Sequence, residues 1–184
     1  MYPLREVSHA DIENWNHAAS QLSRINDLQV QKVMTEIFTG HKKGDIYRLP
    51  TEAEWEFVAR MRGFSTGEYS HGNTVANLSE YAWFGGDHES QTHPVGLKKP
   101  TMINGMPIYD MSGNVSENLA DRYADNLAGG VDPQGPEQRH SRVVRGSSIY
   151  SNLRDELKLS YRSGHRDPSR GYVDVGFRLV RTRP

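Results

Sequence analysis

A short loop with an acidic residue at each end is the first segment whose spacing suggests chemistry. It reads Asp110-x-x-Gly113-x-Val115-x-Glu117. Calcium takes six to eight oxygen ligands at about 2.3–2.6 Å, and carboxylates and backbone carbonyls supply them. A tight turn with a central glycine and two carboxylates could wrap one such ion. The alternative is a turn residue at Asp110 and an acid at Glu117 that begins a helix, where the dipole favours negative charge.

Serine, histidine and acidic residues near the C-terminus could also assemble a hydrolytic triad. The combinations are Ser148 or Ser151 with His165 and with Asp155 or Asp167. No G-x-S-x-G elbow accompanies these serines, and that elbow is the usual sequence sign of such a nucleophile. The residue types therefore fit a polar binding pocket better than a hydrolase.

The eight histidines raise the question of a transition-metal site. No two of them have the i, i+4 spacing of a helical zinc site. His88 and His93 are close enough in sequence to meet in one loop, but the pattern offers no third ligand. Surface histidines are the simpler interpretation.

Composition limits the class of protein. The chain has 184 residues, of which 35% are hydrophobic and 24% charged, with 17 glycines and no cysteine. These values indicate one loop-rich soluble domain, and no apolar run is long enough to span a membrane. The lack of thiols excludes disulfides, thiolate metal sites and a cysteine nucleophile. With a net charge of −1, bulk electrostatics favours neither nucleic acid nor a membrane surface as a partner.

The elements that must position these residues begin with helices. A hydroxyl and an acid three residues later start a helical pattern over 8–25, and a second pattern covers 28–38. The segment 47–50 should be extended, because a residue before proline avoids the helical region. Thr51-Glu-Ala-Glu54 is a capping box, which predicts a helix that buries Trp55 and stops near Gly63.

Beyond residue 64 the sequence changes character, because Gly, Asn, Asp, Ser and Pro recur every few positions. Only 142–145 and 175–180 alternate clearly enough to predict strands. Long loops on few short strands usually serve a metal or a binding surface.

Four segments share one resemblance. In chain order they are Tyr47–Glu56 (YRLPTEAEWE), Tyr109–Glu117 (YDMSGNVSE), Arg142–Ser148 (RVVRGSS) and Gly176–Val180 (GFRLV). Together they resemble the formylglycine-generating-enzyme, or sulfatase-modifying-factor, superfamily over nearly the whole chain. The resemblance implies an α+β, elaborated C-type-lectin-like fold with few short strands and two to three helices. It implies a single domain over 1–184 that lacks the family's N-terminal strands, either compact or part of a longer chain or an oligomer.

The resemblance also implies where calcium would bind. In the family, the first site uses the side chains of the first and last loop positions and two backbone carbonyls. The matching positions here are Asp110, Gly113, Val115 and Glu117. A second family site begins at an Asn side chain and the next carbonyl, which match Asn77 and Leu78, with Asp87 as the nearest acidic candidate.

Departures from the family pattern bear on catalysis. Active members hold copper with two cysteines, and the corresponding positions here are Ser151 and Glu156. Neither side chain is a ligand that Cu(I) prefers, since Cu(I) selects thiolate and thioether sulfur. We therefore expect neither copper binding nor formylglycine generation. Family tryptophans are replaced by Ser116, Asn118 and Ile149, so their space must be refilled or opened into a pocket.

Two classes of function remain. The first is a calcium-stabilised binding domain, a pseudoenzyme whose C-terminal groove recognises a peptide, protein or glycan. The second is a cysteine-independent enzyme that tailors a peptide, oxidatively or otherwise, through Ser148, Ser151, Glu156 and His165. The missing thiols favour binding. No signal peptide is visible after Met1, so the compartment stays open, and an extracytoplasmic location would suit a chain that continues upstream.

Overall fold

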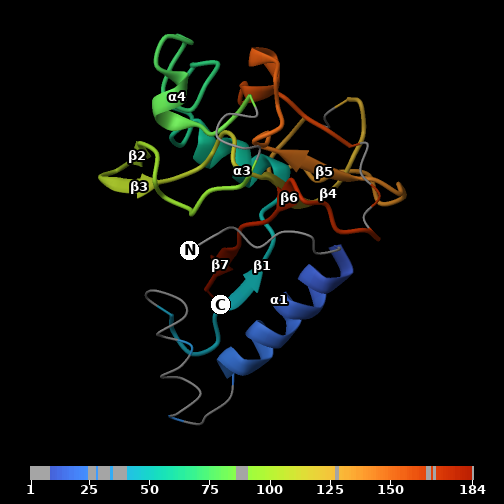
Figure 1. Cartoon of the computed structure of the whole chain (residues 1–184). Helices are drawn as coiled ribbons and strands as arrows, with labels where there is room; N and C mark the ends of the chain where they lie inside the picture. The colour runs from blue at the N-terminus through green and yellow to red at the C-terminus, as the bar shows by residue number, and fades with distance from the viewer. Residues whose placement is uncertain are drawn as a thin grey trace.

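The computed structural model describes residues 9–24, 28, 34, 41–85, 91–126, 129–164, 167 and 169–183. The helices are α1 (His9–Arg24), α3 (Glu52–Ala59), α4 (Leu78–Tyr81) and the 3-10 turn η1 (Arg154–Leu157). The strands are β1 (Ile46–Arg48), β2 (Thr101–Ile103), β3 (Met106–Ile108), β4 (Ser116–Arg122), β5 (Arg142–Arg145), β6 (Val175–Gly176) and β7 (Val180–Thr182). Figure 1 shows these short elements joined by long loops. The predicted α+β class, with few short strands and three helices, is confirmed.

Strand β4 is the centre of the largest sheet. It pairs with β5 in the antiparallel sense and with β6 in the parallel sense. Glu117 therefore lies opposite Arg145 on one side and opposite Gly176 on the other. The remaining strands form the antiparallel pair β1–β7 and the hairpin β2–β3. This arrangement brings the three family segments beyond residue 100 into direct contact.

The capping box forms as the sequence predicts. The Thr51 hydroxyl accepts a hydrogen bond from the Glu54 backbone N–H, and the Thr51 backbone N–H donates to the Glu54 carboxylate. Arg48, at the end of β1, donates two further hydrogen bonds to the same carboxylate, at 2.7 and 2.6 Å. These contacts fix the start of α3 against β1, so the helix begins at a defined point under the sheet.

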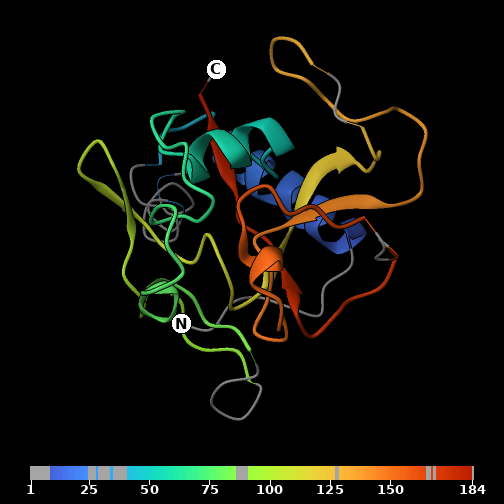
Figure 2. The same ribbon diagram turned by 90° about the horizontal axis from the view of Figure 1, so that it is seen from above.

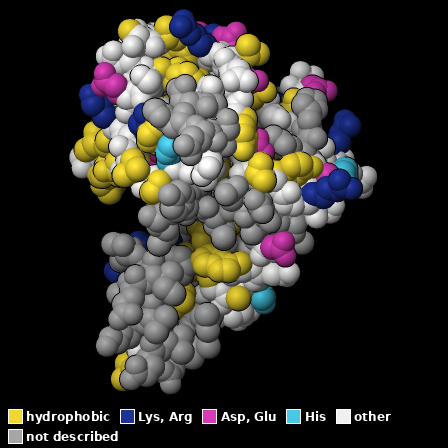
Figure 3. Space-filling model, viewed as in Figure 1, with side chains coloured by type: hydrophobic (Ala, Val, Ile, Leu, Met, Phe, Trp, Pro, Cys, Tyr) yellow, Lys and Arg dark blue, Asp and Glu magenta, His cyan; other side chains and the backbone are white. Residues whose placement is uncertain are grey.

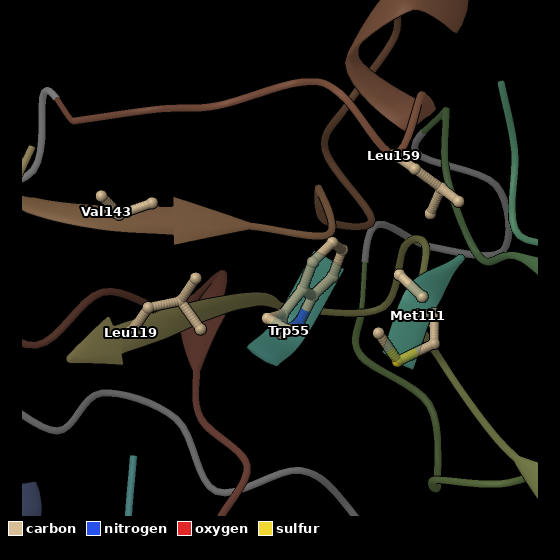
Figure 4. Close-up of a cluster of buried hydrophobic side chains, with 6 residues drawn as sticks. Trp55, Met111, Leu119, Val143 and Leu159 are labelled. Atoms are coloured by element: carbon tan, nitrogen blue, oxygen red, sulfur yellow. The ribbon is translucent and has the colours of Figure 1, made fainter. Parts of the chain in front are cut away.

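Trp55, on α3, is the largest side chain of the main hydrophobic core and is 2% exposed. Figure 4 shows its ring between the side chains of β4 and β5 and those of two loops. The buried members of this cluster are Trp55, Ala59, Met111, Leu119, Val143 and Leu159. The predicted burial of Trp55 on this helix is therefore confirmed.

Helix α1 packs on β1 in the lower part of Figure 1. Ser20 anchors it, because its hydroxyl accepts the Tyr47 N–H at 3.0 Å and lies 3.2 Å from the Tyr47 carbonyl. Ile12 and Ala19 form the buried face, whereas Trp15 lies at its edge. The helix predicted over 8–25 is confirmed as α1, and most of the one predicted over 28–38 lies outside the described residues.

The strand predicted over 175–180 is wrong as a single element. Residues 175–176 form β6 beside β4, residues 177–179 form no strand, and β7 then pairs with β1. The apolar residues alternate in the sequence, but burial does not alternate over this segment, and its two ends join different sheets. The strand predicted over 142–145 is confirmed as β5, and the segment predicted to be extended over 47–50 overlaps the end of β1.

On the surface, acidic and basic side chains are interspersed over the face shown in Figure 3, as a net charge of −1 suggests. Hydrophobic side chains gather over the β2–β3 hairpin, where Met102 and Met106 are exposed. Within the described ranges, no helix has the length and apolar character needed to cross a bilayer.

Candidate functional site

A sharp turn follows β5 and sets the position of the serines. Gly146 and Ser147 both have positive φ, at 87° and 63°, so the chain reverses at once after Arg145. Ser147 is the unusual member, because a non-glycine residue rarely adopts this region and often does so at functional sites. The Gly146 carbonyl accepts a hydrogen bond from the Gly113 N–H at 2.7 Å. The serine turn and the 110–117 loop are therefore one connected unit.

The turn opens onto a polar cavity of about 190 Å³. Ser148, Ser151 and Glu156, three of the four predicted pocket candidates, line this cavity. The Ser148 N–H donates to the Ser151 hydroxyl at 3.2 Å. The Ser147 hydroxyl donates to the backbone carbonyl of Glu156, which ties η1 to the turn. His165, the fourth predicted pocket residue, lies outside the described residues.

Asp174 is a pocket residue that the sequence analysis missed. It is buried, and its carboxylate lies 3.4 Å from the Ser148 hydroxyl. It reaches the cavity because β6 runs parallel to β4, and the Ser116 N–H donates to the Asp174 carbonyl at 2.8 Å. No local motif marks this aspartate, so only the strand pairing could have identified it.

Ser116, at the start of β4, is a position where the sequence resemblance implies a tryptophan in the family. Its small side chain lies in the cavity wall. Tyr150 and Tyr161 also line the cavity and are both partly exposed. Asn118 is buried in β4 opposite Val144, so that second replaced position is refilled rather than opened. The cavity therefore offers hydroxyls, carboxylates and aromatic rings, and none of its atoms is a thiol.

The 110–117 loop is held in one conformation by its backbone. Asp110 and Asn114 have positive φ, and Gly113 lies at φ 80° with Trp83 against it. A Cβ at position 113 would lie 2.2 Å from the Trp83 carbonyl oxygen, so only glycine fits there. The buried Asn114 amide accepts the His93 N–H and donates to the His93 carbonyl, which fastens the loop to the neighbouring chain.

The carboxylates of Asp110 and Glu117 differ in their hydrogen-bond partners. One Asp110 oxygen accepts the Gly96 N–H at 2.8 Å, and the other is buried with no hydrogen-bond partner. Burial raises the pKa of the Asp110 carboxyl. The Gly96 N–H and Arg178 oppose this rise, and the nearby Glu117 carboxylate adds to it. Glu117 accepts from the Trp55 indole at 2.7 Å and from Arg178 at 2.6 and 2.5 Å.

The Asp110 end of the loop would suit a cation, whereas the Glu117 carboxylate is already paired with Arg178. The unpartnered Asp110 oxygen and its repulsion by Glu117 are features that a cation would relieve, and all ligands would be hard oxygen atoms. Arg178 opposes the ion, because its guanidinium also donates to the carbonyls of Tyr109 and Asp110. Among the described residues, no three His, Asp or Glu side chains are clustered to hold a metal.

The residues of the second predicted calcium site lie at the start of α4. Asn77 is the exposed N-cap of α4, and the Leu78 side chain is buried in a separate hydrophobic cluster. The Leu78 carbonyl already accepts the Ala82 N–H at 2.9 Å within the helical turn. Asp87 lies outside the described residues. The second site therefore stays a prediction.

Comparison with known proteins identifies the family of this chain. Residues 1–183 match the family described as "Sulfatase-modifying factor enzyme 1-like domain". The chain belongs to this family, which includes the formylglycine-generating enzymes. The resemblance drawn from the four sequence segments is confirmed.

Individual relatives agree with this assignment. The chain is 35% identical to the formylglycine-generating enzyme of Thermomonospora curvata, covering 72% of this chain and 48% of that protein. It is 29% identical to the mouse (Mus musculus) protein named inactive C-alpha-formylglycine-generating enzyme 2, covering 72% of this chain and 42% of that protein. The solved structure of Treponema denticola variable protein 1 is 38% identical, with a TM-score of 0.65 over 76% of this chain and 49% of that chain. The chain thus spans about half the length of these relatives.

Proposed function

We propose that this chain is a ligand-binding domain of the sulfatase-modifying-factor family that lacks formylglycine-generating activity. The observation that supports it is the cavity after β5, where Ser148, Ser151 and Glu156 meet Asp174. Its hydroxyls and carboxylates can exchange hydrogen bonds with a peptide, protein or glycan. The partly exposed Tyr150 and Tyr161 add flat surfaces of the kind that adaptable binding sites use.

The chemistry of the wall argues against formylglycine generation. The chain has no cysteine, so no thiolate can hold Cu(I) or exchange with a substrate thiol. Ser151 and Glu156 occupy the wall where the family's cysteines are expected, and both offer oxygen. A relative named as inactive shows that members of this family can lose the activity.

A cysteine-independent enzyme is the less well supported alternative. It would need a base that activates Ser148. The Ser148 hydroxyl lies 3.4 Å from the Asp174 carboxylate and accepts the Tyr150 N–H at 3.3 Å. The distance to Asp174 is long for a hydrogen bond between a hydroxyl and a carboxylate. Binding therefore accounts for more of the geometry than nucleophilic catalysis does.

Calcium belongs to this proposal as a stabiliser of the domain. Asp110 and Glu117, with the carbonyls of Gly113 and Val115, would hold the ion. The 110–117 loop donates to the Gly146 carbonyl and accepts from Ile149 through Asn114, so an ordered loop also orders the serine turn. Arg178 next to Glu117 reduces the net negative charge, and we expect it to limit the affinity.

Binding can be tested by restoring the bulky side chain that the family has at position 116. Arrays of peptides and glycans would be probed with the wild-type chain, with Ser116→Trp and with Ser79→Trp. Ser79 is exposed on α4, away from the cavity, and is the matched control. We expect the wild type and the control to bind the same array members, whereas Ser116→Trp fills the cavity and loses them. Binding that survives in folded Ser116→Trp would contradict the proposed site.

A further inference from the structure

A second and larger cavity lies away from the serine turn. It has a volume of about 520 Å³ and shares no residue with the cavity after β5. One wall is the outer face of α3, and the opposite wall comes from the loop that joins β4 to β5. Figure 2 shows this loop reaching out beside α3. Its volume falls within the range of sites for small molecules, about 300–1,000 Å³.

Apolar side chains that are exposed on the surface of α3 line this cavity. Phe57 projects from α3 on the side away from the core and is 52% exposed, and Ala53 lies one turn before it. Pro133 and Pro136 line the cavity from the loop. Apolar rings thus line the cavity from both elements, and this arrangement suits a flat ring placed between them.

The acidic residues of the cavity all have hydrogen-bond partners within the fold. Three acidic and three basic side chains line it, and they are Glu52, Glu56, Asp121, Arg60, Arg122 and Arg162. Glu52 is bonded to Arg162 through both of its oxygens, at 2.6 and 2.8 Å. Glu56 accepts from Arg60 at 2.6 Å.

Asp121 is satisfied in a different way. Its carboxylate accepts backbone N–H groups from Glu52 and Gly135, at 2.6 and 2.5 Å. These bonds also fasten the loop to the start of α3. Each carboxylate therefore has a partner already, so a cationic ligand would have to break an ion pair to gain a counterion. Arg122 donates to the Arg139 carbonyl and has no carboxylate partner among the described contacts, so it could meet an anionic group.

We propose that this cavity binds a molecule that carries a flat aromatic ring and no positive charge. The ring lies against Phe57 and the two prolines, and the guanidinium of Arg60 offers a further stacking surface. The proposal does not depend on the cavity after β5 and assigns the domain a second ligand site.

Two fluorescent probes that differ by one charged group test the proposal. N-phenyl-1-naphthylamine is neutral and aromatic, and 1-anilinonaphthalene-8-sulfonate has the same rings with a sulfonate. We expect saturable binding of the neutral probe with one site per chain. The sulfonate should bind within about tenfold of the neutral probe, because the ring contacts are the same and Arg122 can meet its charge. Binding of the sulfonate without binding of the neutral probe would show that the charge rather than the ring is recognised, and would overturn the proposal.

Variants then locate the probe. Phe57→Ala removes one wall and Ala53→Trp fills the space, and each should weaken binding of the neutral probe by about tenfold or more. Phe64→Ala is the matched control, because Phe64 is 84% exposed and lies outside the cavity. It should change binding by less than about twofold. Thermal melts confirm that each variant folds. If Ala53→Trp does not fold, Phe57→Ala alone tests the site.

Two results would refute the site. One is the absence of saturable binding to the wild-type chain. The other is binding that neither Phe57→Ala nor Ala53→Trp changes while both fold. The Ser116→Trp variant, which closes the other cavity, should bind the neutral probe like the wild type. The two binding proposals can therefore fail separately.

Discussion

The role of Trp55 can be divided into packing and hydrogen bonding by two substitutions. The ring fills the centre of the main core, and its indole N–H donates to Glu117 at 2.7 Å. Trp55→Ala removes both contributions, whereas Trp55→Phe keeps most of the ring and loses the hydrogen bond. Phe57→Ala is the matched control on the same helix, because Phe57 is half-exposed.

The structure sets the expected magnitudes. Loss of a hydrogen bond to a charged group costs about 1.5–3 kcal/mol, and we expect Trp55→Phe to fall in this range. Truncation of a buried tryptophan to alanine costs about 3–5 kcal/mol from the cavity alone, so Trp55→Ala should cost at least that much. Phe57→Ala should stay within about 0.5 kcal/mol of the wild type. The whole domain has only about 5–15 kcal/mol of stability, so Trp55→Ala should leave it marginal.

Urea unfolding followed by far-ultraviolet circular dichroism measures these differences at pH 7. Trp55→Phe keeps the comparison measurable if Trp55→Ala does not fold. A Trp55→Ala variant as stable as Phe57→Ala would refute the placement of Trp55 in the core. A Trp55→Phe variant as stable as the wild type would show that the bond to Glu117 contributes nothing.

Three further predictions concern calcium, pH and catalysis. A chelator should lower the melting temperature, and calcium at a hundredfold excess over Kd should restore about 2.7 kcal/mol. Asp110→Ala should remove this response, whereas Asp132→Ala, an exposed aspartate that also has positive φ, should keep it. The hydrogen bonds from Arg48 hold the pKa of Glu54 below its ordinary value. Ionised Glu54 therefore stabilises the folded protein at any pH above the pKa that Glu54 has in the unfolded chain. This stabilisation is lost as the pH falls through the lower pKa that Glu54 has in the folded protein. Glu54→Gln should therefore cost about 0.5–1 kcal/mol at pH 7 and less at pH 3 by urea midpoint, and an equal cost at both pH values would count against the ion pair. Mass spectrometry of a sulfatase-type cysteine peptide incubated with copper-loaded protein and oxygen should show no aldehyde above a no-protein control, and its appearance would contradict our account of the missing thiols.

The pocket shows how far local sequence could lead. Ser148, Ser151 and Glu156 were predicted from their match to family positions, and η1 and the serine turn bring them together. Asp174 was missed, because its place depends on a parallel pairing between segments almost sixty residues apart. The sequence predicted that the space of the replaced tryptophans is either refilled or opened into a pocket, but it did not show which. Only the packing shows that position 116 opens a cavity and position 118 does not.

The sequence by itself determined the local elements and the family. A capping box fixes the start of α3 through contacts within four residues, and four ordered motifs identify the family without any coordinates. Tertiary structure decided which charges meet. Arg178 pairs with Glu117 across 61 residues of chain, and Glu52 with Arg162 across 110. The split of 175–180 between two sheets has the same origin. A side-chain pattern records which residues are buried, but strand partners and ion pairs depend on where distant segments pack.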